Sequence, residues 1–256
     1  MIEISLLKII WAFLAISVRL TGLMLFAPFF GSFAVSPQIK ASFVVAFSIL
    51  LYPVVSAMLM TADLSRWPTL IFGELLIGAA MGIATNLVFD AVQMAGQVLS
   101  IQMGLSLVTL LDPQTQADST VVAMFHQALA MLIFLRLDVH LWLLGAIGRS
   151  FQILPLGTIQ FSSAFTMATV RAGGAVFVLG LQMAAPVFSA TLLADIVLGL
   201  LGKASPNMPL MLLGQPIKVL LGLAILFAAL RYWPTMLARF FESTAELTNR
   251  LLILAR

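Results

Sequence analysis

"TLIFGELLIGAAMGIATNLVFDAVQMAGQVLSIQ", residues 69–102, is apolar throughout except for a few amide, hydroxyl and acidic side chains. An α-helix rises about 1.5 Å per residue, so this segment would extend for about 50 Å, whereas the hydrocarbon core of a bilayer is about 30 Å thick. Such a helix must either tilt and leave the membrane or break inside it. A short extension into water at one end is the plainer alternative.

The rest of the chain has the same apolar character. Its 256 residues are 62% hydrophobic and 9% charged, with a mean hydropathy of +1.12, whereas soluble domains carry about 25% charged residues. A soluble fold of this length could not hide so much apolar surface from water, so we predict an integral membrane protein. The apolar segments are too long for barrel strands and do not alternate, which leaves an all-α fold.

Apolar segments of helical length divide the chain into about six predicted spans. We expect these spans to form a single membrane domain over residues 1–235. The segment 163–201 is also too long for one crossing and contains glycines and a proline, so it too must tilt or break. The candidate spans are 4–26, 38–60, 69–102, 121–147, 163–201 and 209–232.

Residues 236–256 are predicted to form a C-terminal amphipathic helix. Apolar side chains recur every three or four residues, and charged ones fill much of the other side. This pattern fits either an interfacial helix on the membrane surface or a docking surface for a partner protein, of which we favour docking. The stripe consists of Leu237, Phe240, Thr244, Leu247, Leu251 and Leu254.

Charge and cysteine content exclude several classes of function. The formal net charge is +3, but the 13 basic residues are scattered singly, so no nucleic-acid surface is expected. Cysteine is absent, which excludes disulfides and thiol chemistry. The positive-inside rule favours cytoplasmic termini. The N-terminal segment lacks the basic start and cleavage site of a signal peptide and is expected to remain as the first helix.

Several ionisable side chains fall in or near the apolar spans. Each would cost several kcal/mol if it faced lipid, so we expect each to face protein or water. Arg136 and Asp138 could instead mark a helix end, where snorkelling makes charges inexpensive. Gly78 and Gly82 form a G-x-x-x-G pair near Glu74, which predicts close approach by another helix or a partner chain. The charges are Arg19, Glu74, Asp90, Arg136, Asp138, Arg171 and Asp195, of which we assign Glu74, Arg136, Asp138, Arg171 and Asp195 to buried or interface positions.

Polar residues recur at intervals of three and four along residues 86–104, which places them on one face of a helix. Apolar residues such as Leu87, Val92 and Leu99 occupy the opposite face. A polar face on a membrane helix either hydrogen-bonds to a neighbouring subunit or lines an aqueous path, and both interpretations require shelter from lipid. The polar stripe comprises Asn86, Asp90, Gln93, Gln97 and Ser100, and is followed by Gly104.

No pattern in the chain is typical of an enzyme, a cofactor site or a metal site. His126 and His140 are the only histidines, and none of the H-E-x-x-H, G-x-S-x-G, Walker A or G-x-G-x-x-G motifs is present. We interpret His126 as a hydrogen-bonding residue on a helix face rather than a ligand. A small-solute transporter is the stronger alternative, because intramembrane charges and broken helices suit one, although the chain shows no internal repeat.

Three stretches resemble the FliR family, the single-copy export-gate subunit of flagellar type III secretion. They are "VRLTGLMLFAPFFGSFAVSPQIKASFVVAFSILLYP" (18–53), "GELLIGAAMGIATNLVFDAVQMAGQVLSIQMGLSLVTLLDP" (73–113) and "LLGKASPNMPLMLLGQPIKVLLGL" (200–223). The resemblance covers nearly the whole chain, and its middle stretch is the most specific. There Gly73-Glu74, Gly96-Gln97, Gly104-Leu105-Ser106 and Asp112-Pro113 stand in the expected order. The equivalent subunit of a virulence secretion system is the alternative.

The resemblance implies an architecture and a set of partners. Helical hairpins would join FliP and FliQ subunits in a helical assembly around a central export channel, much of it raised out of the ordinary membrane plane. Such an assembly would account for the over-long helices. Unfolded export substrates would pass through the channel, and the FlhB switch protein would dock as a separate chain. The assembly would lie in the flagellar basal body, in contact with the lipid of the bacterial inner membrane.

The resemblance also implies that a loop, here about Met103 to Ser119, projects into the channel and helps plug it. A flexible apolar constriction excludes ions by dewetting while it still admits an extended chain. Gly104 and Asp112-Pro113 would stop the preceding helix, so that the segment folds back into the channel. An ordinary external loop is the alternative. The plug residues would be Met103, Gly104, Leu105, Ser106, Leu107, Val108, Thr109, Leu110, Leu111, Asp112 and Pro113.

Overall fold

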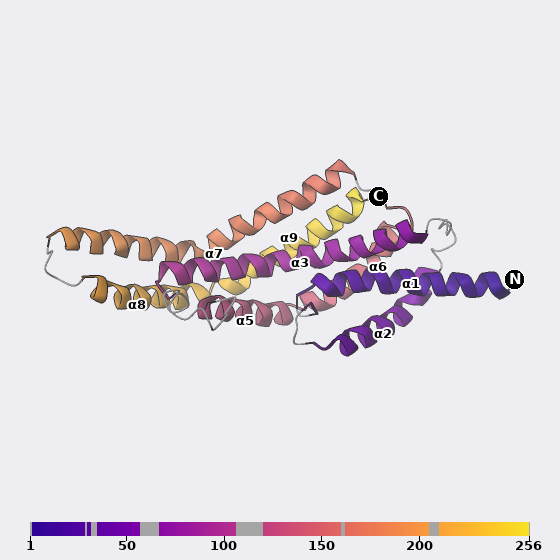
Figure 1. The fold of residues 1–256 in the computed structure, drawn as a ribbon, viewed down its shortest axis with the longest axis horizontal. Coiled ribbons are helices and arrows are strands. Elements are labelled where there is room, and N and C mark those ends of the chain that lie inside the picture. The colour runs from indigo at the N-terminus through magenta and orange to yellow at the C-terminus, as the bar shows by residue number, and fades with distance from the viewer. Residues whose placement is uncertain are drawn as a thin grey trace. The chain divides into compact units, whose positions relative to one another are not determined.

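The computed structural model confirms the all-α prediction, because every secondary-structure element among the residues that it describes is a helix (Figure 1). It describes residues 2–28, 30–31, 35–56, 67–105, 120–159, 162–204 and 210–255. The helices, labelled as in Figure 1, are α1 (Ile2–Phe26), α2 (Pro37–Ser56), α3 (Trp67–Gln102), α5 (Val121–Arg136), α6 (Val139–Ile153), α7 (Ser163–Ala204), α8 (Leu210–Leu230) and α9 (Trp233–Leu254).

The lengths and apolarity of these helices agree with a membrane protein. Within the described ranges, three helices are long and apolar enough to cross a bilayer, namely α3, α7 and the Ile9–Phe26 part of α1. Two bent pairs, α5 with α6 and α8 with α9, meet the same requirement together, and each bends by 63° at a short break. The apolar part of α2, Pro37–Pro53, is shorter. Each candidate span therefore has a helical counterpart.

The two longest candidate spans are continuous helices, whereas the candidate span 121–147 contains a break. α3 and α7 run for 36 and 42 residues, and α7 continues through Pro186 because a proline in a membrane helix can be accommodated locally. The segment 121–147, by contrast, contains the end of α5 and the start of α6. Asp138 has a φ of 54°, a left-handed conformation through which an α-helix cannot continue. The break agrees with the alternative interpretation, in which Arg136 and Asp138 mark a helix end.

The chain folds as two compact units that share several helices. The first unit comprises residues 1–87, 134–173 and 241–256, and the second comprises residues 88–133 and 174–240. The unit boundaries fall inside α3, α5, α7 and α9. Long helices therefore link the two units, and the C-terminal residues of the described chain belong to the first.

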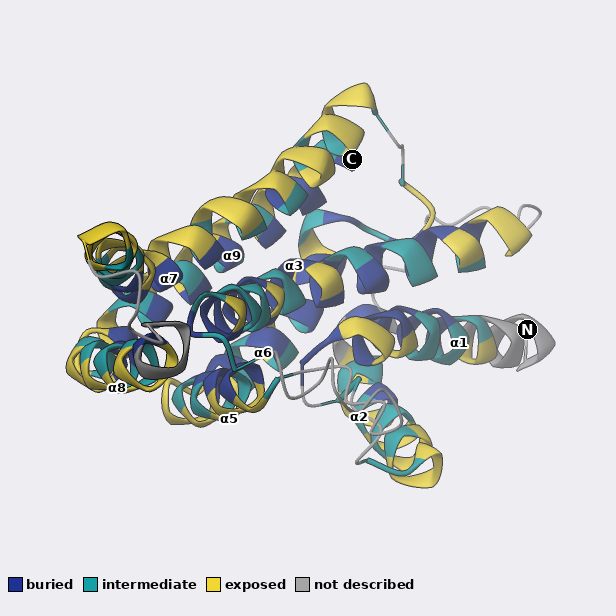
Figure 2. Cartoon of the chain, turned by 60° about the vertical axis from the view of Figure 1, so that its left-hand side comes forward, coloured by how far each residue is buried: buried dark blue, intermediate teal, exposed yellow. Residues whose placement is uncertain are grey.

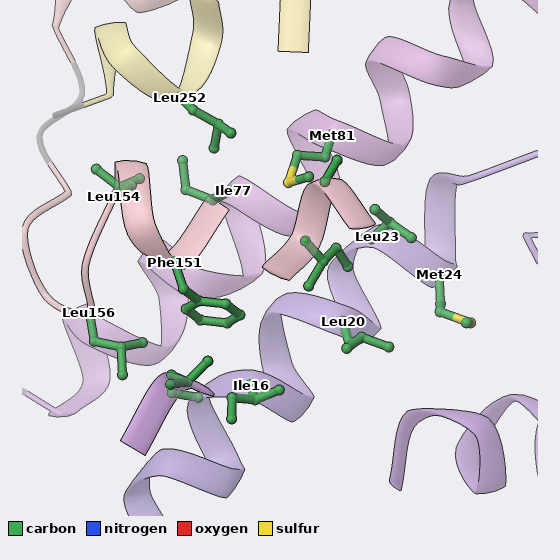
Figure 3. Packing of buried hydrophobic residues seen from close by; sticks show 14 of the residues in the cluster. Ile16, Leu20, Leu23, Met24, Ile77, Met81, Phe151, Leu154, Leu156 and Leu252 are labelled. Carbon is green, nitrogen blue, oxygen red and sulfur yellow. The ribbon is translucent and has the colours of Figure 1, made fainter. Parts of the chain in front are cut away.

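An apolar cluster contributed by α1, α2, α3, α6 and α9 forms the core of the first unit. Figure 3 shows Ile16 of α1, Ile77 of α3, Phe151 of α6 and Leu252 of α9 among its side chains. Lipid tails are as apolar as these residues, so their burial stabilises the unit mainly through dispersion and shape complementarity. The cluster brings helices from both ends of the sequence together.

The apolar stripe of α9 packs within the chain over its C-terminal half. Of the stripe residues, Thr244 and Leu251 are buried, and Leu247 and Leu254 are half-buried. The hydroxyl of Ser162 donates to the carbonyl of Leu254 at 2.9 Å. The chain itself thus covers part of this half of the stripe, and the choice between an interfacial helix and a docking surface stays open.

α7 is the least covered of the long helices. Of its most apolar window 17% of residues are buried, against 61% for α3, and Figure 2 shows exposed residues along much of its length. In a membrane protein such a surface meets either lipid or another polypeptide. Its exposed apolar residues include Val170, Phe177, Val178, Leu181, Leu193, Ile196 and Leu200.

Candidate functional site

α3 ends in a well-defined cap. The amide of Leu105 donates to the carbonyl of Ser100 at 2.9 Å, and the amide of Gly104 donates to the carbonyl of Ile101 at 3.0 Å. Gly104 has a φ of 78°. These are the two hydrogen bonds of a Schellman motif, in which a residue with left-handed backbone terminates the helix. Glycine adopts this conformation without steric cost, so α3 stops at this point for a local reason.

The capped end of α3 lies against α8. A Cβ on Gly222 would lie 2.6 Å from Cε of Met103, so the fully buried methionine occupies the space that a side chain at position 222 would fill. A Cβ on Gly104 would lie 2.5 Å from the side-chain oxygen of Gln215. Both residues that follow α3 are thus packed on the same neighbouring helix.

A polar network joins the last residue of α3 to α7 and α8. Gln102 donates from Nε2 to Oδ2 of Asp195 at 3.1 Å. Lys218 donates from Nζ to the same oxygen at 2.9 Å and lies 2.7 Å from Oδ1. The side chains of Lys218 and Asp195 are 13% and 40% exposed, so the ion pair contributes at most about 1 kcal/mol. Its effect is to join three helices at one point, and we name these three residues the Asp195 network.

Of the predicted plug, the structure describes only the beginning. Met103 is buried, and Gly104 and Leu105 are half-buried in the turn that follows α3. The plug function of these residues stays a prediction. The remaining predicted plug residues lie outside the described residues, and they are Ser106, Leu107, Val108, Thr109, Leu110, Leu111, Asp112 and Pro113.

The polar stripe of α3 is mostly less deeply buried than the opposite side of the helix. Asp90 is exposed, and Asn86, Gln93 and Gln97 are half-buried. The buried side of the helix consists of apolar residues, among them Val88, Val92, Ala95 and Leu99. Ser100 is buried as well, and its hydroxyl has no hydrogen-bond partner among the described residues. The choice between a channel lining and a subunit interface stays open.

A buried charge cluster fixes α1, α3 and α6 in the first unit. Arg19 donates from Nε to Oε2 of Glu74 at 2.5 Å, from Nη1 to Oγ of Ser150 at 2.9 Å, and from Nη2 to the carbonyl of Leu154 at 3.2 Å. The guanidinium lies 3.9 Å from the ring centroid of Phe151. Both charged side chains are 0% exposed. We name this group the Arg19–Glu74 cluster.

The Arg19–Glu74 cluster specifies which helices meet rather than adding much stability. For a buried ion pair the desolvation penalty roughly offsets the Coulomb attraction, while loss of one partner leaves an uncompensated charge. Oε1 of Glu74 is buried and has no hydrogen-bond partner among the described residues, which increases the dependence of Glu74 on Arg19. The sequence identified Glu74 without this partner, although two opposite charges inside apolar spans signal a pair.

The other charges that were predicted to be buried differ in their location and in their exposure to solvent. Arg136 is the last residue of α5 and Asp138 the residue before α6, so they stand at a helix end, as the alternative interpretation proposed. Both are exposed, as is Arg171 in α7, whereas Asp195 is half-buried in its network. A role for the exposed charges at an interface with another chain stays a prediction.

Gly78 and Gly82 lie against α1 of the same chain. A Cβ on Gly78 would overlap the carbonyl oxygen of Arg19, and one on Gly82 would lie 2.7 Å from the carbonyl oxygen of Leu23. On α1, a Cβ on Gly22 would likewise overlap the backbone of α3. Because the obstructing atoms are backbone, they cannot move aside as a side chain would. These three glycines set the close approach of α1 and α3.

His126 makes a hydrogen bond within its own helix. Nδ1 of His126 lies 2.7 Å from the carbonyl of Val122, one turn earlier in α5, and must carry the proton since a carbonyl only accepts. The ring lies edge-on to Trp233, with centroids 4.5 Å apart. His126 thus makes the helix-face hydrogen bond that the sequence suggests. Across the described ranges, no group of three His, Asp or Glu side chains is placed to hold a metal ion.

The chain matches the protein family described as bacterial export proteins, family 1, over residues 10–244. The match begins within α1 and ends within α9. It therefore includes the Arg19–Glu74 cluster, the end of α3 and the Asp195 network.

Individual relatives show the same extent of similarity. The chain is 30% identical over 230 residues to the flagellar biosynthetic protein FliR of Pectobacterium carotovorum subsp. carotovorum, which covers 90% of this chain and 88% of the relative. It is 31% identical over 197 residues to FliR of Escherichia coli (strain K12), with 77% and 69% covered. With FliR of Bacillus subtilis (strain 168) it is 26% identical over 253 residues, which covers 98% of each.

Proposed function

Because the chain belongs to the bacterial export proteins, family 1, we propose that it is a non-enzymatic subunit of the flagellar protein export gate, situated in the flagellar basal body and the bacterial inner membrane. The observation that carries this proposal is the family match over residues 10–244. The three relatives described above are all flagellar proteins by name, which favours a flagellar over a virulence secretion system.

Other subunits would cover the surfaces that this chain leaves open. We propose that FliP and FliQ subunits pack on it, that FlhB docks as a separate chain, and that lipid covers the remainder. Two observations support this assembly. α7 exposes a long apolar surface, and the polar stripe of α3 is mostly half-buried or exposed. Amide and acidic side chains in an apolar span need polar surroundings, which a neighbouring subunit or a water-filled channel supplies.

The segment that follows the capped end of α3 would plug the channel. Unfolded export substrates must pass while ions are held back, and an apolar constriction achieves this by dewetting. Leu107, Leu110 and Leu111 supply apolar side chains, and Met103 can adapt its shape. The cap at Gly104 supports this proposal, because it turns the chain away from the α3 axis where the predicted plug begins.

Deletion of residues 106–112 is expected to raise the ion permeability of the closed complex while the complex still assembles. A seven-residue Gly/Ser replacement of the same segment separates chain length from apolarity, and we expect it to leak as well because it cannot exclude water. Ion flux into cells or proteoliposomes that hold the purified complex measures both variants. An assembled deletion complex that remains as tight as the wild type would rule out a plug at this position.

Affinity purification of the chain in mild detergent, followed by mass measurement of the intact particle, is expected to recover a complex with other small apolar membrane proteins. The expectation follows from the exposed apolar surface of α7, which a lone chain leaves without a protein partner. A transporter would instead purify alone and show saturable solute uptake in proteoliposomes. A stable single-chain particle with such uptake would overturn the proposed function.

A further inference from the structure

α1 and α3 lie side by side and run in the same direction. Their contacting pairs, in order along both helices, are Trp11 with Trp67, Arg19 with Glu74, Gly22 with Gly78 and Leu23 with Gly82. Because the residue numbers of both partners rise together, the two helices are parallel. Both are long and apolar enough to cross a bilayer. A chain that crosses twice in the same direction must return between the two crossings, and α2 lies between these helices in the sequence.

The apolar part of α2 is the shortest of the three. It extends over Pro37–Pro53, near the lower limit of about 17 residues for one crossing, and its last residue is a proline inside the helix. The hydroxyl of Ser17 on α1 donates to that of Ser48 on α2 at 3.0 Å. α2 therefore gains support from α1, and its crossing depends on α1 staying in place.

Arg19 makes α1 a poor crossing helix on its own. It stands near the middle of the apolar part of α1, Ile9–Phe26. An arginine is least tolerated at the centre of a crossing helix, where its cost offsets much of the gain from the surrounding apolar side chains. A side chain near a helix end can extend to the membrane surface, but one at the middle has much farther to reach. α1 therefore needs a partner for its charge.

Glu74 supplies the opposite charge at the same depth, because it contacts Arg19 where α1 and α3 meet. Nε of Arg19 donates to Oε2 of Glu74, and both side chains are 0% exposed. The other donors of Arg19 reach the hydroxyl of Ser150 and the carbonyl of Leu154. Those two acceptors follow Glu74 in the chain and are synthesised after it. Glu74 is therefore the first of these partners that Arg19 meets, and the one that neutralises its charge.

The glycine contact beside the ion pair determines the direction in which α3 must cross. Gly22 follows Arg19 by three residues and Gly78 follows Glu74 by four, so both glycines lie on the same side of the ion pair. A Cβ on either glycine would overlap the backbone of the other helix, which shows how closely the helices approach there. If α3 crossed in the opposite direction, residues before Glu74 would lie opposite Gly22. The ion pair and the glycine contact could then not form together.

We propose that the Arg19–Glu74 pair, together with this glycine contact, fixes the membrane topology of the first three helices. α1 stays across the membrane only while α3 crosses parallel to it, and this arrangement requires α2 to cross between them. The pair thus acts within a single chain and before other subunits bind. A buried ion pair that adds little net stability can still select one arrangement over another.

The side of the membrane on which position 38 lies tests this proposal in the full chain. Gln38 is exposed in the first turn of α2, so its side shows whether α1 has crossed. The natural chain has no cysteine, and Gln38→Cys therefore introduces its only thiol. A membrane-impermeant maleimide labels this thiol from one side in spheroplasts and from the other side in inverted vesicles. We expect labelling of this reference chain from one side only.

Removal of the acidic partner is expected to disturb this topology. Glu74→Leu in the reference chain should raise the fraction labelled from the opposite side by at least about tenfold, because Arg19 loses its counter-charge. Arg19→Met combined with Glu74→Leu removes both charges and should restore the reference labelling, which a packing defect at position 74 would not. Lys218→Met, which breaks the ion pair of the second unit, is the matched control and should leave the labelling unchanged.

A milder variant separates loss of charge from failure to fold. Glu74→Gln retains the size of the side chain and an acceptor oxygen, and should shift the labelling in the same direction by a smaller factor. The labelled fraction is measured relative to the amount of full-length chain, so degradation of a variant does not change it. Reference labelling of both Glu74 variants would overturn the proposal. A reference chain labelled from both sides, or a double variant labelled like Glu74→Leu, would overturn it as well.

Discussion

Replacement of Arg19 by methionine is expected to destabilise the first unit by about 3–5 kcal/mol, the cost of leaving one member of a buried ion pair without its partner. Glu74 would remain fully buried without its cationic partner. Reversible unfolding of the detergent-solubilised protein, followed by tryptophan fluorescence, measures the change. We expect the same substitution to reduce the amount of assembled complex in cells.

Two further variants test whether the unpaired charge of Glu74 causes the loss of stability. Arg19→Met combined with Glu74→Leu removes both charges, and replacement of a buried pair by apolar residues is often neutral, so most of the lost stability should return. Lys218→Met breaks the half-exposed pair of the second unit and should cost no more than about 1 kcal/mol. If Arg19→Met were as mild as Lys218→Met, the assignment of a structural role to the Arg19–Glu74 cluster would not stand.

Alanine at Gly78 is expected to have the second largest effect. Its methyl group would overlap the carbonyl oxygen of Arg19, so α1 and α3 must move apart, which costs about 1–3 kcal/mol or more for overpacking. The displacement would also disturb the ion pair that Arg19 makes with Glu74. The same unfolding measurement detects the loss.

Gly199 provides the matched control for this substitution. It also lies inside an apolar helix, α7, but a Cβ there would meet no atom within 4 Å. Gly199→Ala should therefore stabilise the helix by about 0.5–1 kcal/mol through the difference in helix propensity. Opposite signs for the two substitutions are the expected result. Equal losses at both positions would mean that the α1–α3 contact does not depend on Gly78.

Apolar segment length predicted the helices of this protein well, because a span must bury about 20 residues whatever its neighbours are. The same signal could not locate the break after Arg136. No glycine or proline marks the stretch from Arg136 to Val139, and the break depends on the left-handed backbone of Asp138. Conversely, Pro186 in α7 looked like a helix breaker but is not one, since context decides whether a membrane helix tolerates proline.

The neighbours of each helix were harder to predict than the helices themselves. The stripe of α9 correctly marked a face that needs cover, but periodicity cannot identify what covers it. In the structure, the chain itself buries Thr244 and Leu251 of this stripe. In the same way, Gly78 and Gly82 indicated a close contact without indicating that α1 makes it.

The candidate site was predictable only in part for the same reason. Gly104 and Asp195 were singled out from local signals, a helix-ending glycine and a charge inside an apolar span. Gln102 and Lys218, the partners of Asp195, stand 93 and 23 positions away along the chain. Their meeting depends on how three helices are rotated about their axes, and local sequence does not determine such rotations.

The exposed apolar surface of α7 has a consequence for how cells control the amount of this protein. A 42-residue helix is about 60 Å long, twice the thickness of the hydrocarbon core of the bilayer. In a copy that is not bound to other subunits, the part of α7 outside the bilayer therefore exposes apolar side chains to water. Surface of that kind is what membrane-bound proteases and chaperones recognise. Copies without partner subunits should be degraded quickly. The abundance of the partner subunits, rather than the rate of synthesis of this chain, should therefore set its steady-state amount in the cell.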